Sequence, residues 1–273
     1  MSPTKFIHEI FSAEIRNNMN CLKNICSRLR EARKKRILYT LWFNFKHFSF
    51  HQAKTLPIVF FKGAYAAVCD GGKIVLTEPF WENKGKVYIG VPTMDFEYQC
   101  EKTYLNITSG RIEFTGKFEA RRGTLMEIRG VAIMGANVRF APRCRLRVHN
   151  SIEIGDNVGF SHESQVFDTN FHYTEPVGKE GFYPISSPIR IGSHVWVCNR
   201  CTLMPGTIIP DYTIVASNSL VNKDFSKLRH NSLIGGVPAK LIKEGVARVW
   251  DTKREFEYHK REFEWYRKMY EKK

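Results

Sequence analysis

Residues 191–221 read IGSHVWVCNRCTLMPGTIIPDYTIVASNSLV and repeat with a period of six. Every sixth residue of this stretch is aliphatic: Ile191, Val197, Leu203, Ile209, Val215 and Val221. The residue four places after each of the first five is small or β-branched: Val195, Cys201, Thr207, Thr213 and Ser219. An amphipathic helix would repeat apolar residues every three or four positions, and a flat strand would alternate every two. The period of six therefore indicates a different architecture.

The same two columns continue upstream in two blocks. In one block the large apolar column is Ile154, Phe160 and Val166, and the column four residues later is Val158, Ser164 and Asn170. In the other block the large apolar column is Ile128, Met134 and Phe140, and the column four residues later is Ala132, Val138 and Cys144. Two extra residues separate the blocks, near His149 and Asn150. Before residue 128 the register is irregular, and four residues suggest further coils: Ile89, Leu105, Ile112 and Phe118.

A period of six fits a three-sided prism in which three short parallel strands and their corners make one coil of about 18 residues. Residues one coil apart then stack at the interstrand spacing of about 4.8 Å, so we expect Ile191 to pair with Ile209, and Val197 with Val215. The aliphatic column fills the narrow interior, and the second column is small because it points into the same axis. Gly, Asn, Asp and Pro at the corners suit turns. A β-sandwich with strands six residues apart is the alternative, and five unbroken hexads disfavour it.

The composition divides the chain into three predicted parts. Residues 1–55 form a basic, mostly helical segment, and residues 56–243 form the β-helix. Residues 244–273 form an amphipathic C-terminal helix, because Phe256, Phe263 and Tyr270 recur every seven residues. We therefore predict a mainly β fold, a parallel β-helix with flanking N- and C-terminal helices.

The charge of the chain favours an anionic partner. It has 42 Lys and Arg against 27 Asp and Glu, a formal net charge of +15. No recognised nucleic-acid motif is present, so we expect no nucleic-acid partner. No apolar stretch reaches the roughly 20 residues of a membrane span, and the N-terminal residues lack the order of a secretory signal. Seven cysteines, an odd number without a dense framework, favour a reducing cytoplasm.

The N-terminal segment carries a basic cluster followed by aromatic residues. The cluster is Arg33, Lys34, Lys35 and Arg36, and the aromatic residues are Trp42, Phe43 and Phe45. This combination could dock on an anionic membrane leaflet, which would make the protein membrane-peripheral. The alternative, slightly favoured, is a helix that packs on the first coil and exposes a basic face.

Four stretches together resemble the hexapeptide-repeat acetyltransferases: IGSHVWV at 191–197, LMPG at 203–206, SLVNKD at 219–224 and GGVPAKLIK at 235–243. The resemblance covers about residues 128–243 and is strongest to the galactoside, maltose and polysaccharide O-acetyltransferases. It implies a left-handed β-helix, a homotrimer with its active sites between adjacent prisms, acetyl-CoA as donor and no metal. The activity it implies is transfer of an acetyl group to a hydroxyl of a saccharide.

A hydroxyl acceptor needs a general base, and histidine titrates near neutral pH. The candidate is His172, in the stretch VFDTNFHY at 166–173, where the hexads stop and a loop over 173–187 begins. The order Asp-x-Asn-x-His also resembles the family's active-site segment. In the alternative interpretation His172 only ends the coil and faces solvent.

Residues around His172 are candidates for the acceptor site. Asp168 could orient the imidazole or bind an acceptor hydroxyl, and Asn170 could do the latter; both are also ordinary corner residues. Aromatic residues of the loop suit stacking on sugar rings: Phe171, Tyr173, Phe182 and Tyr183.

The resemblance also implies the residues that bind CoA. Trp196 matches the tryptophan that walls the pantetheine arm. Polar positions along the cofactor groove correspond to Asn199, Ser217 and Asn222, two of which depart from the usual small or hydroxyl residue. Lys223 and Lys243 match basic positions near the nucleotide phosphates; the alternative for both is a solvated surface charge.

Three other functions remain open at this point. One is an N-acetyltransferase that acts on an amino sugar or aminoglycoside-like amine, and another is a non-catalytic trimeric scaffold. The third is a zinc carbonic anhydrase on the same prism, for which His149, His162 and His194 would have to converge, and we expect no metal site. Cys198 and Cys201 form a C-x-x-C, but Cys201 falls in the small interior column, so we expect a core residue.

Overall fold

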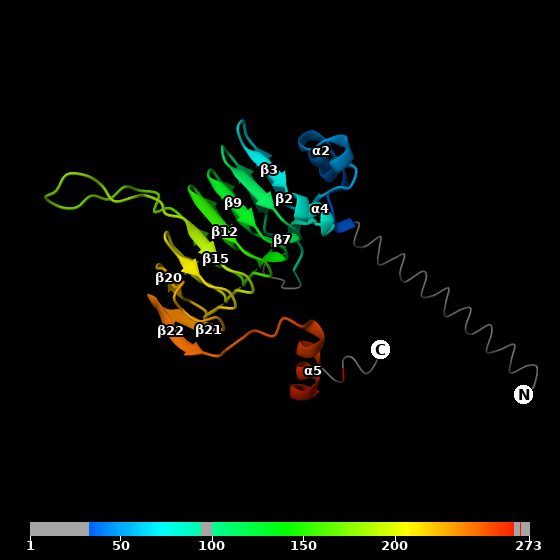
Figure 1. Cartoon of the computed structure of the whole chain (residues 1–273). Coiled ribbons are helices and arrows are strands. Elements are labelled where there is room, and N and C mark those ends of the chain that lie inside the picture. Colours follow the sequence, from blue (N-terminus) through cyan, green and yellow to red (C-terminus); the bar gives the residue numbers. More distant parts are fainter. Residues whose placement is uncertain (1–32, 94–99, 265–267, 269–273) are drawn as a thin grey trace, which may run out of the picture.

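The computed structural model describes residues 33–93, 100–264 and 268. Its main body is a stack of coils, each of which adds one strand to each of three sheets (Figure 1). Within the stack neighbouring strands are parallel, except the last two strands of the chain, which pair antiparallel. The predicted fold class, a left-handed parallel β-helix, is confirmed.

The three sheets are named here after their first strands. The β1 sheet contains β1 (Ile58–Phe60), β4 (Val87–Val91), β7 (Phe118–Arg121), β10 (Val138–Phe140), β13 (Gly159–Phe160), β16 (Trp196–Val197), β19 (Ile214–Val215), β21 (Ser232–Gly236) and β22 (Ala239–Glu244). The β2 sheet contains β2 (Ala64–Val68), β5 (Thr103–Ile107), β8 (Leu125–Ile128), β11 (Arg145–Val148), β14 (Gln165–Phe167), β17 (Thr202–Leu203) and β20 (Leu220–Val221). The β3 sheet contains β3 (Lys73–Leu76), β6 (Arg111–Phe114), β9 (Val131–Met134), β12 (Ser151–Ile154), β15 (Ile189–Ile191) and β18 (Ile208–Ile209).

The strand register confirms the predicted stacking. Ile191 pairs with Ile209 and Val197 pairs with Val215, each across one coil. From Phe118 to Phe160 each coil is two residues longer, as between Phe140 and Phe160. The two additional residues lie where the sequence placed them, at the corner of His149 and Asn150 that follows β11.

The interior of the prism is filled by the two predicted columns. The aliphatic column and the small column are both buried in the downstream coils, which start at Ile191. Buried hydroxyls in the small column bond to nearby carbonyls: Thr207 Oγ1 donates to the oxygen of Val221 at 2.9 Å and Ser219 Oγ to that of Ala216 at 2.6 Å. The interior therefore has no unmatched hydroxyl at these positions, which the low dielectric would make costly.

The corners hold the coils together through short polar side chains. The Asp156 carboxylate accepts the Ala136 amide at 2.6 Å, and the Asp211 carboxylate accepts the Ser193 amide at 2.7 Å. Asn137 and Asn157 stack on one corner with φ of 60° and 56°. Asn tolerates this left-handed conformation better than most residues. In the next two coils His194 and Tyr212 adopt it at the same corner, with φ of 58° and 56°.

Among the residues that the structure describes, four helices lie outside the stack: α2 (Ile37–His47), α3 (Phe50–Ala53), α4 (Glu78–Glu82) and α5 (Thr252–Glu262). The α2 helix covers the first coil, where Phe43 is fully buried. The side-chain nitrogen of Asn44 donates to the backbone carbonyl of Ile58 at 2.7 Å, and its side-chain oxygen accepts the backbone amide of Ile58 at 3.1 Å. Asn44 thus satisfies polar groups on the edge strand β1.

Asp251 is the N-cap residue of α5, and its carboxylate accepts the backbone amide of Lys253 at 2.8 Å. Tyr270 of the predicted C-terminal helix lies outside the described residues, as do residues 1–32 of the N-terminal segment. In the part of the chain that the structure describes, no helix combines the length and the apolar character needed to cross a membrane.

Candidate functional site

The stack opens at one corner to form a long loop. Ile152 pairs with Ile189, so this coil is about twice as long as its neighbours. Bridges between Thr169 and Ser186, and between Thr174 and Tyr183, make the loop an antiparallel ribbon. In Figure 1 the ribbon projects far from the prism between β14 and β15. His172 lies in its first arm and is exposed.

Asp168 anchors the base of this loop. It is fully buried, and its two carboxylate oxygens accept the amides of His149 at 2.7 Å and Asn150 at 2.8 Å. Burial raises the pKa of Asp168, and the two amide bonds oppose that rise. No hydrogen bond joins this carboxylate to the His172 ring within the described residues. The structure therefore shows Asp168 holding the loop base to the neighbouring coil.

The residue before His172 packs back onto the stack. Phe171 has a φ of 63°, and its amide donates to Thr169 Oγ1 at 3.1 Å. Its ring meets the rings of His149 and Phe167 edge to face, each at 5.7 Å between centroids. The contact fixes the turn that leads into His172, at the cost of a backbone conformation that a bulky residue rarely adopts.

The other aromatic residues predicted for the acceptor lie farther out. Tyr173 and Phe182 pair edge to face across the ribbon at 5.1 Å. They and Tyr183 are more than half exposed. Asn170 is also exposed, and its backbone amide donates to the carbonyl of Ile185 at 2.8 Å. The loop thus presents apolar rings to solvent beside His172.

Two predicted CoA residues lie on the same edge of the prism as the loop. The corner after β14 forms the loop, and the corner after β20, two coils farther on, holds Asn222 and Lys223. Both side chains are exposed. The Lys223 ammonium lies 5.2 Å from the centre of the Phe225 ring.

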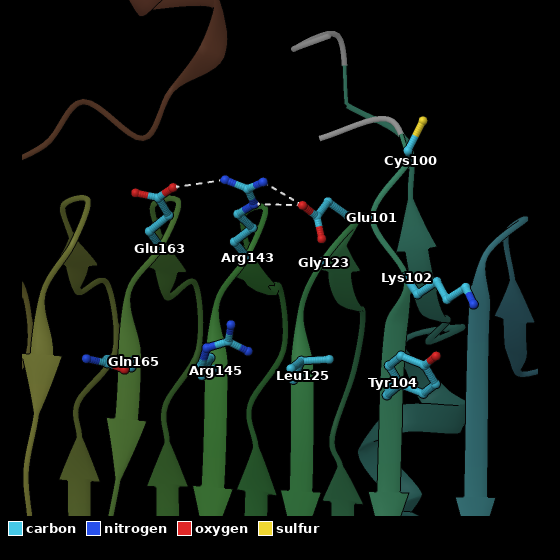
Figure 2. A pocket seen from close by; sticks show the side chains of 10 residues that line it. All are labelled: Cys100, Glu101, Lys102, Tyr104, Gly123, Leu125, Arg143, Arg145, Glu163 and Gln165. Carbon is cyan, nitrogen blue, oxygen red and sulfur yellow. Dashed lines mark hydrogen bonds and ion pairs between the residues drawn. The ribbon is translucent and has the colours of Figure 1, made fainter. Parts of the chain in front are cut away.

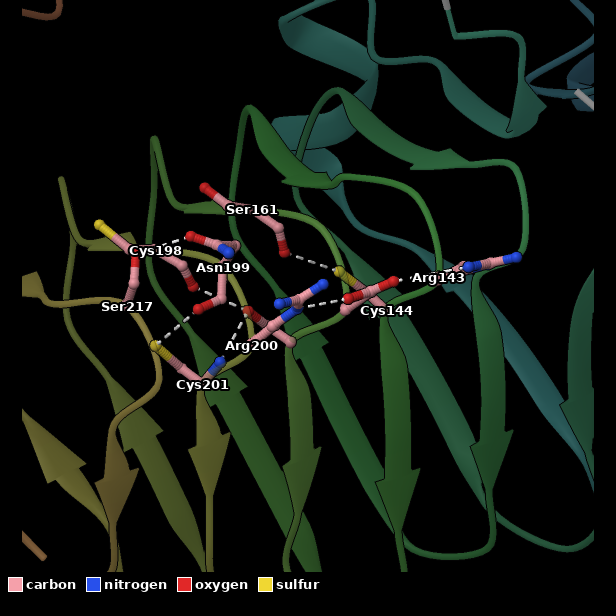
Figure 3. A network of polar contacts seen from close by, with 10 residues as sticks. Arg143, Cys144, Ser161, Cys198, Asn199, Arg200, Cys201 and Ser217 are labelled. Atoms are coloured by element: carbon pink, nitrogen blue, oxygen red, sulfur yellow. Dashed lines mark hydrogen bonds and ion pairs between the residues drawn. The ribbon is translucent and has the colours of Figure 1, made fainter. Parts of the chain in front are cut away.

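Two others lie on a different edge, between the β1 and β2 sheets. Ser217 Oγ donates to Asn199 Oδ1 at 2.6 Å, which joins the corners of consecutive coils. Figure 3 shows this pair beside Cys198 and Cys201. The Cys201 thiol is buried, and burial raises its pKa to about 11, so it is a core residue as predicted.

Trp196 lies on the outer side of the β1 sheet and is partly covered. Its indole nitrogen donates to Ser161 Oγ at 3.1 Å. The guanidinium of Arg248 lies 4.9 Å from the Trp196 ring and 4.5 Å from the Trp250 ring, so the segment after β22 covers one side of the indole. Lys243 is exposed on β22, where it pairs with Leu233.

One chain therefore does not bring all candidates together. The structure groups the loop residues, the pair Asn222 and Lys223, and the pair Asn199 and Ser217. The edge that carries His172 joins the β2 and β3 sheets, whereas Trp196 lies on the β1 sheet. In a three-sided prism that edge is opposite the β1 sheet, so His172 and Trp196 of the same chain face away from each other.

A ladder of ion pairs was not anticipated from the sequence. Arg143 bonds Glu101 at 2.5 Å and approaches Glu163 at 3.5 Å, and Glu163 bonds Arg200 at 2.7 Å. The hydrogen bond from Arg200 lowers the pKa of Glu163. The ladder follows the edge between the β1 and β2 sheets, the edge that also holds Asn199 and Ser217.

The ladder borders a hollow of about 750 Å³ on the face of the β2 sheet (Figure 2). Its other lining residues include Lys102, Tyr104, Arg145 and Gln165. Arg145 is exposed and makes no ion pair with a described residue. The partners in the ladder come from different coils. The sequence therefore indicates this ladder only through charged residues at outward positions of successive coils.

The three histidines considered for zinc lie on three different edges. His149 follows β11, His162 follows β13, and His194 precedes β16, where its ring stacks on Tyr212 at 4.6 Å. Over residues 33–93, 100–264 and 268, no group of three or more His, Cys, Asp or Glu side chains could hold a metal ion.

No family model matches the chain. The chain is 30% identical to the putative lipopolysaccharide biosynthesis O-acetyl transferase WbbJ of Escherichia coli K12 over 145 residues. This alignment covers 50% of this chain and 72% of WbbJ. It is also 31% identical to the galactoside O-acetyltransferase of the same organism over 94 residues. That alignment covers 34% of this chain and 44% of the other protein.

Among solved structures, the polysialic-acid-specific acetyltransferase NeuO aligns over 75% of this chain and 98% of its own, with a TM-score of 0.44 and 17% identity. The relation to WbbJ covers most of that protein's length and half of this chain. The chain belongs to the hexapeptide-repeat O-acetyltransferase family of which WbbJ is a member.

Proposed function

We propose that this protein transfers an acetyl group from acetyl-CoA to a hydroxyl of a saccharide, with His172 as general base. The observation that carries the proposal is the 30% identity to WbbJ, an O-acetyl transferase named for lipopolysaccharide biosynthesis, over half of this chain. The galactoside O-acetyltransferase also acts, by its name, on a sugar. The exposed His172 on an anchored loop supports the assignment of the base.

The reaction needs one base and one group that stabilises negative charge. The His172 imidazole accepts the proton of the acceptor hydroxyl while that oxygen attacks the thioester carbonyl. Backbone amides stabilise the oxyanion of the tetrahedral intermediate. Collapse of the intermediate breaks the carbon–sulfur bond, and the imidazolium returns its proton to the leaving thiolate. The products are the O-acetyl saccharide and CoA.

The active form in this proposal is a homotrimer. His172 and Trp196 of one chain lie on opposite sides of the prism, so they can serve one site only if two chains contribute. A cyclic trimer brings one edge of each copy against its neighbour and closes the assembly. Sedimentation equilibrium tests this directly, and a monomer that retains full activity would refute it.

The donor would lie along the exposed polar residues of the downstream coils. Asn199, Ser217 and Asn222 supply hydrogen-bonding groups, and Lys223 and Lys243 supply positive charge for the phosphates of CoA. For Trp196 to wall the pantetheine arm, the ligand must use the side of the indole that Arg248 leaves open, or the C-terminal segment must move.

The acceptor would meet the aromatic loop and the hollow of the β2 sheet. Phe171, Tyr173, Phe182 and Tyr183 flank His172 and can stack on sugar rings, with Asn170 as a hydrogen-bonding group. The hollow adds Lys102 and Arg145, and Arg145 has no carboxylate partner among the described residues. This charge favours an acceptor that carries acidic groups.

The decisive experiment compares the wild-type protein with His172→Ala and with a control, His230→Ala, which removes an exposed histidine from another corner. Thiol release is measured with acetyl-CoA and a panel of neutral and acidic saccharides, and acetyl-CoA binding is measured by calorimetry. We expect His172→Ala to lower the transfer rate by about 10²–10⁴-fold without loss of donor binding. Equal rates for all three proteins would exclude His172 as the base, and absence of acetyl-CoA binding by the wild-type protein would exclude the function.

A further inference from the structure

The α2 helix leaves a broad apolar face uncovered. On one side of the helix, Thr40, Phe43 and Asn44 are buried against the first coil. The opposite side and the start of α3 expose large apolar residues: Ile37, Leu38, Leu41, Trp42, Phe45 and Phe50. Leu38 is 82% exposed and Phe50 is 75% exposed. Contiguous apolar patches of this kind on a folded surface generally mark an interaction site.

The residue types on this face suit a lipid interface. Phe45 and Phe50 lie 5.9 Å apart between ring centroids, so helix α3 extends the patch of α2. The Lys46 ammonium lies 5.0 Å from the centre of the Trp42 ring. Tryptophan and phenylalanine beside lysine, with leucine between them, are typical of helices that lie in the boundary between headgroups and acyl chains.

The segment that carries this face has charge of one sign only. From Arg33 to Cys69 the sequence contains no Asp or Glu, and the first carboxylate after this stretch is Asp70. The same stretch contains Lys and Arg at positions Arg33, Lys34, Lys35, Arg36, Lys46, Lys54 and Lys62. Elsewhere on the prism, outward arginines such as Arg121 and Arg143 pair with glutamates. The segment that carries the apolar face is therefore complementary in charge to an anionic plane.

We propose that the apolar face of α2 and α3 docks the protein onto an anionic membrane leaflet. The apolar side chains enter the headgroup boundary, and the surrounding lysines lie against the lipid phosphates. If the protein is the trimer proposed above, cyclic symmetry places three copies of the face at one level along the threefold axis. One plane can then engage all three, which raises the apparent affinity. The docking itself does not depend on the acetyltransferase activity.

Vesicle flotation with the full-length protein tests this inference. The probes are vesicles of phosphatidylcholine alone and of phosphatidylcholine with phosphatidylglycerol. Two variants remove the two components of the face: Leu38→Ser with Phe45→Ser, and Lys46→Gln with Lys54→Gln. The matched control is Ile242→Ser, which removes an exposed apolar residue from β22, at the opposite end of the stack (Figure 1).

We expect the wild-type protein and the control to bind the phosphatidylglycerol vesicles and to bind pure phosphatidylcholine far more weakly. Each double variant should weaken binding by about tenfold or more, and added salt should weaken the wild type as well. Equal binding by variants and wild type, or no binding by the wild type, would overturn the proposal. So would a smaller assembly for Leu38→Ser with Phe45→Ser in sedimentation, because the face would then join copies of the chain. Thermal unfolding of each variant shows whether it is folded.

Discussion

The coils before the loop and the coils after it differ in size and in content. Upstream, strands β8 and β11 of the β2 sheet have four residues each. Downstream, strands β17 and β20 of the same sheet have two residues each, and each coil is shorter by two residues. The two additional residues thus lengthen one side of the upstream prism, at the corner that later opens into the loop.

The interiors differ accordingly. The upstream coils bury large rings, and Phe140 and Phe160 stack with centroids 4.4 Å apart. The downstream coils bury valine, leucine, isoleucine, cysteine and short hydroxyl residues. The longer coils therefore make room for aromatic side chains in the interior, whereas the shorter coils keep a strict repeat along which the proposed donor residues lie. His172 leaves the stack at the boundary between the two.

The largest expected effect comes from removal of the loop. The corner His149-Asn150 can replace residues 169–187, because Val166 and Ile189 stack on Leu146 and Ile152. We expect acetyl transfer to fall at least hundredfold, since the general base is lost, while the far-ultraviolet circular dichroism stays that of the β-helix. Activity close to wild type would show that the chemistry lies elsewhere on the prism.

A second change tests the aromatic interior of the upstream coils. Phe140→Ala removes a fully buried ring from its stack on Phe160, and we expect a loss of about 3–5 kcal/mol in the free energy of unfolding. Val197→Ala, two coils farther along the same column, removes fewer buried carbons and should cost less. Denaturant unfolding of both variants measures the difference, and equal losses would mean that the two interiors are packed alike.

A third pair compares glycines at the corners of the two regions. A Cβ on Gly130 would lie 2.1 Å from the carbonyl oxygen of Asn150 in the next coil, so Gly130→Ala must push neighbouring coils apart. Gly206 has a φ of 79°, and its Cβ would meet nothing closer than 3.9 Å. We expect Gly206→Ala to cost about 1–2 kcal/mol from backbone strain, and Gly130→Ala to cost more. The reverse order of melting temperatures would contradict the close stacking of the upstream coils.

A fourth pair compares the aspartates at the corners of the two regions. Asp168→Asn replaces one of two acceptor oxygens at the base of the loop by an amide group that cannot accept the second backbone N–H. We expect a loss of about 1–3 kcal/mol in the free energy of unfolding, because one buried amide loses its partner. Asp211→Asn keeps an acceptor for its single amide bond and should change stability less. Thermal unfolding compares the two, and a larger effect at Asp211 would reverse the assignment of Asp168 as the anchor.

The fold was predictable where the period of six is unbroken. Each hexad reports two interior positions, so the pairing of Ile191 with Ile209 followed from counting residues. Before residue 128 the same counting failed, although Ile89, Leu105, Ile112 and Phe118 are buried in strands as suggested. The reason is that the coil length itself varies: the coil from Leu105 to Met126 is one residue longer than the coil from Met126 to Leu146.

The candidate site was predictable only in part. The break in the hexads located the loop and His172, because a residue that leaves the interior pattern must leave the coil. The ladder from Glu101 through Arg143 and Glu163 to Arg200 could not be found this way. Its members are joined by stacking of coils, and a single sequence does not state which outward residues become neighbours.

The prism, its interior columns and the position of the loop follow from the sequence alone, because local residue spacing sets which side chains face the interior. Three features became visible only in the folded chain: Asp168 holds the loop base, Arg248 covers Trp196, and an apolar face of α2 is exposed. These contacts join segments distant in the chain. They depend on how the coils stack and where the terminal segments pack, and residue spacing predicts neither.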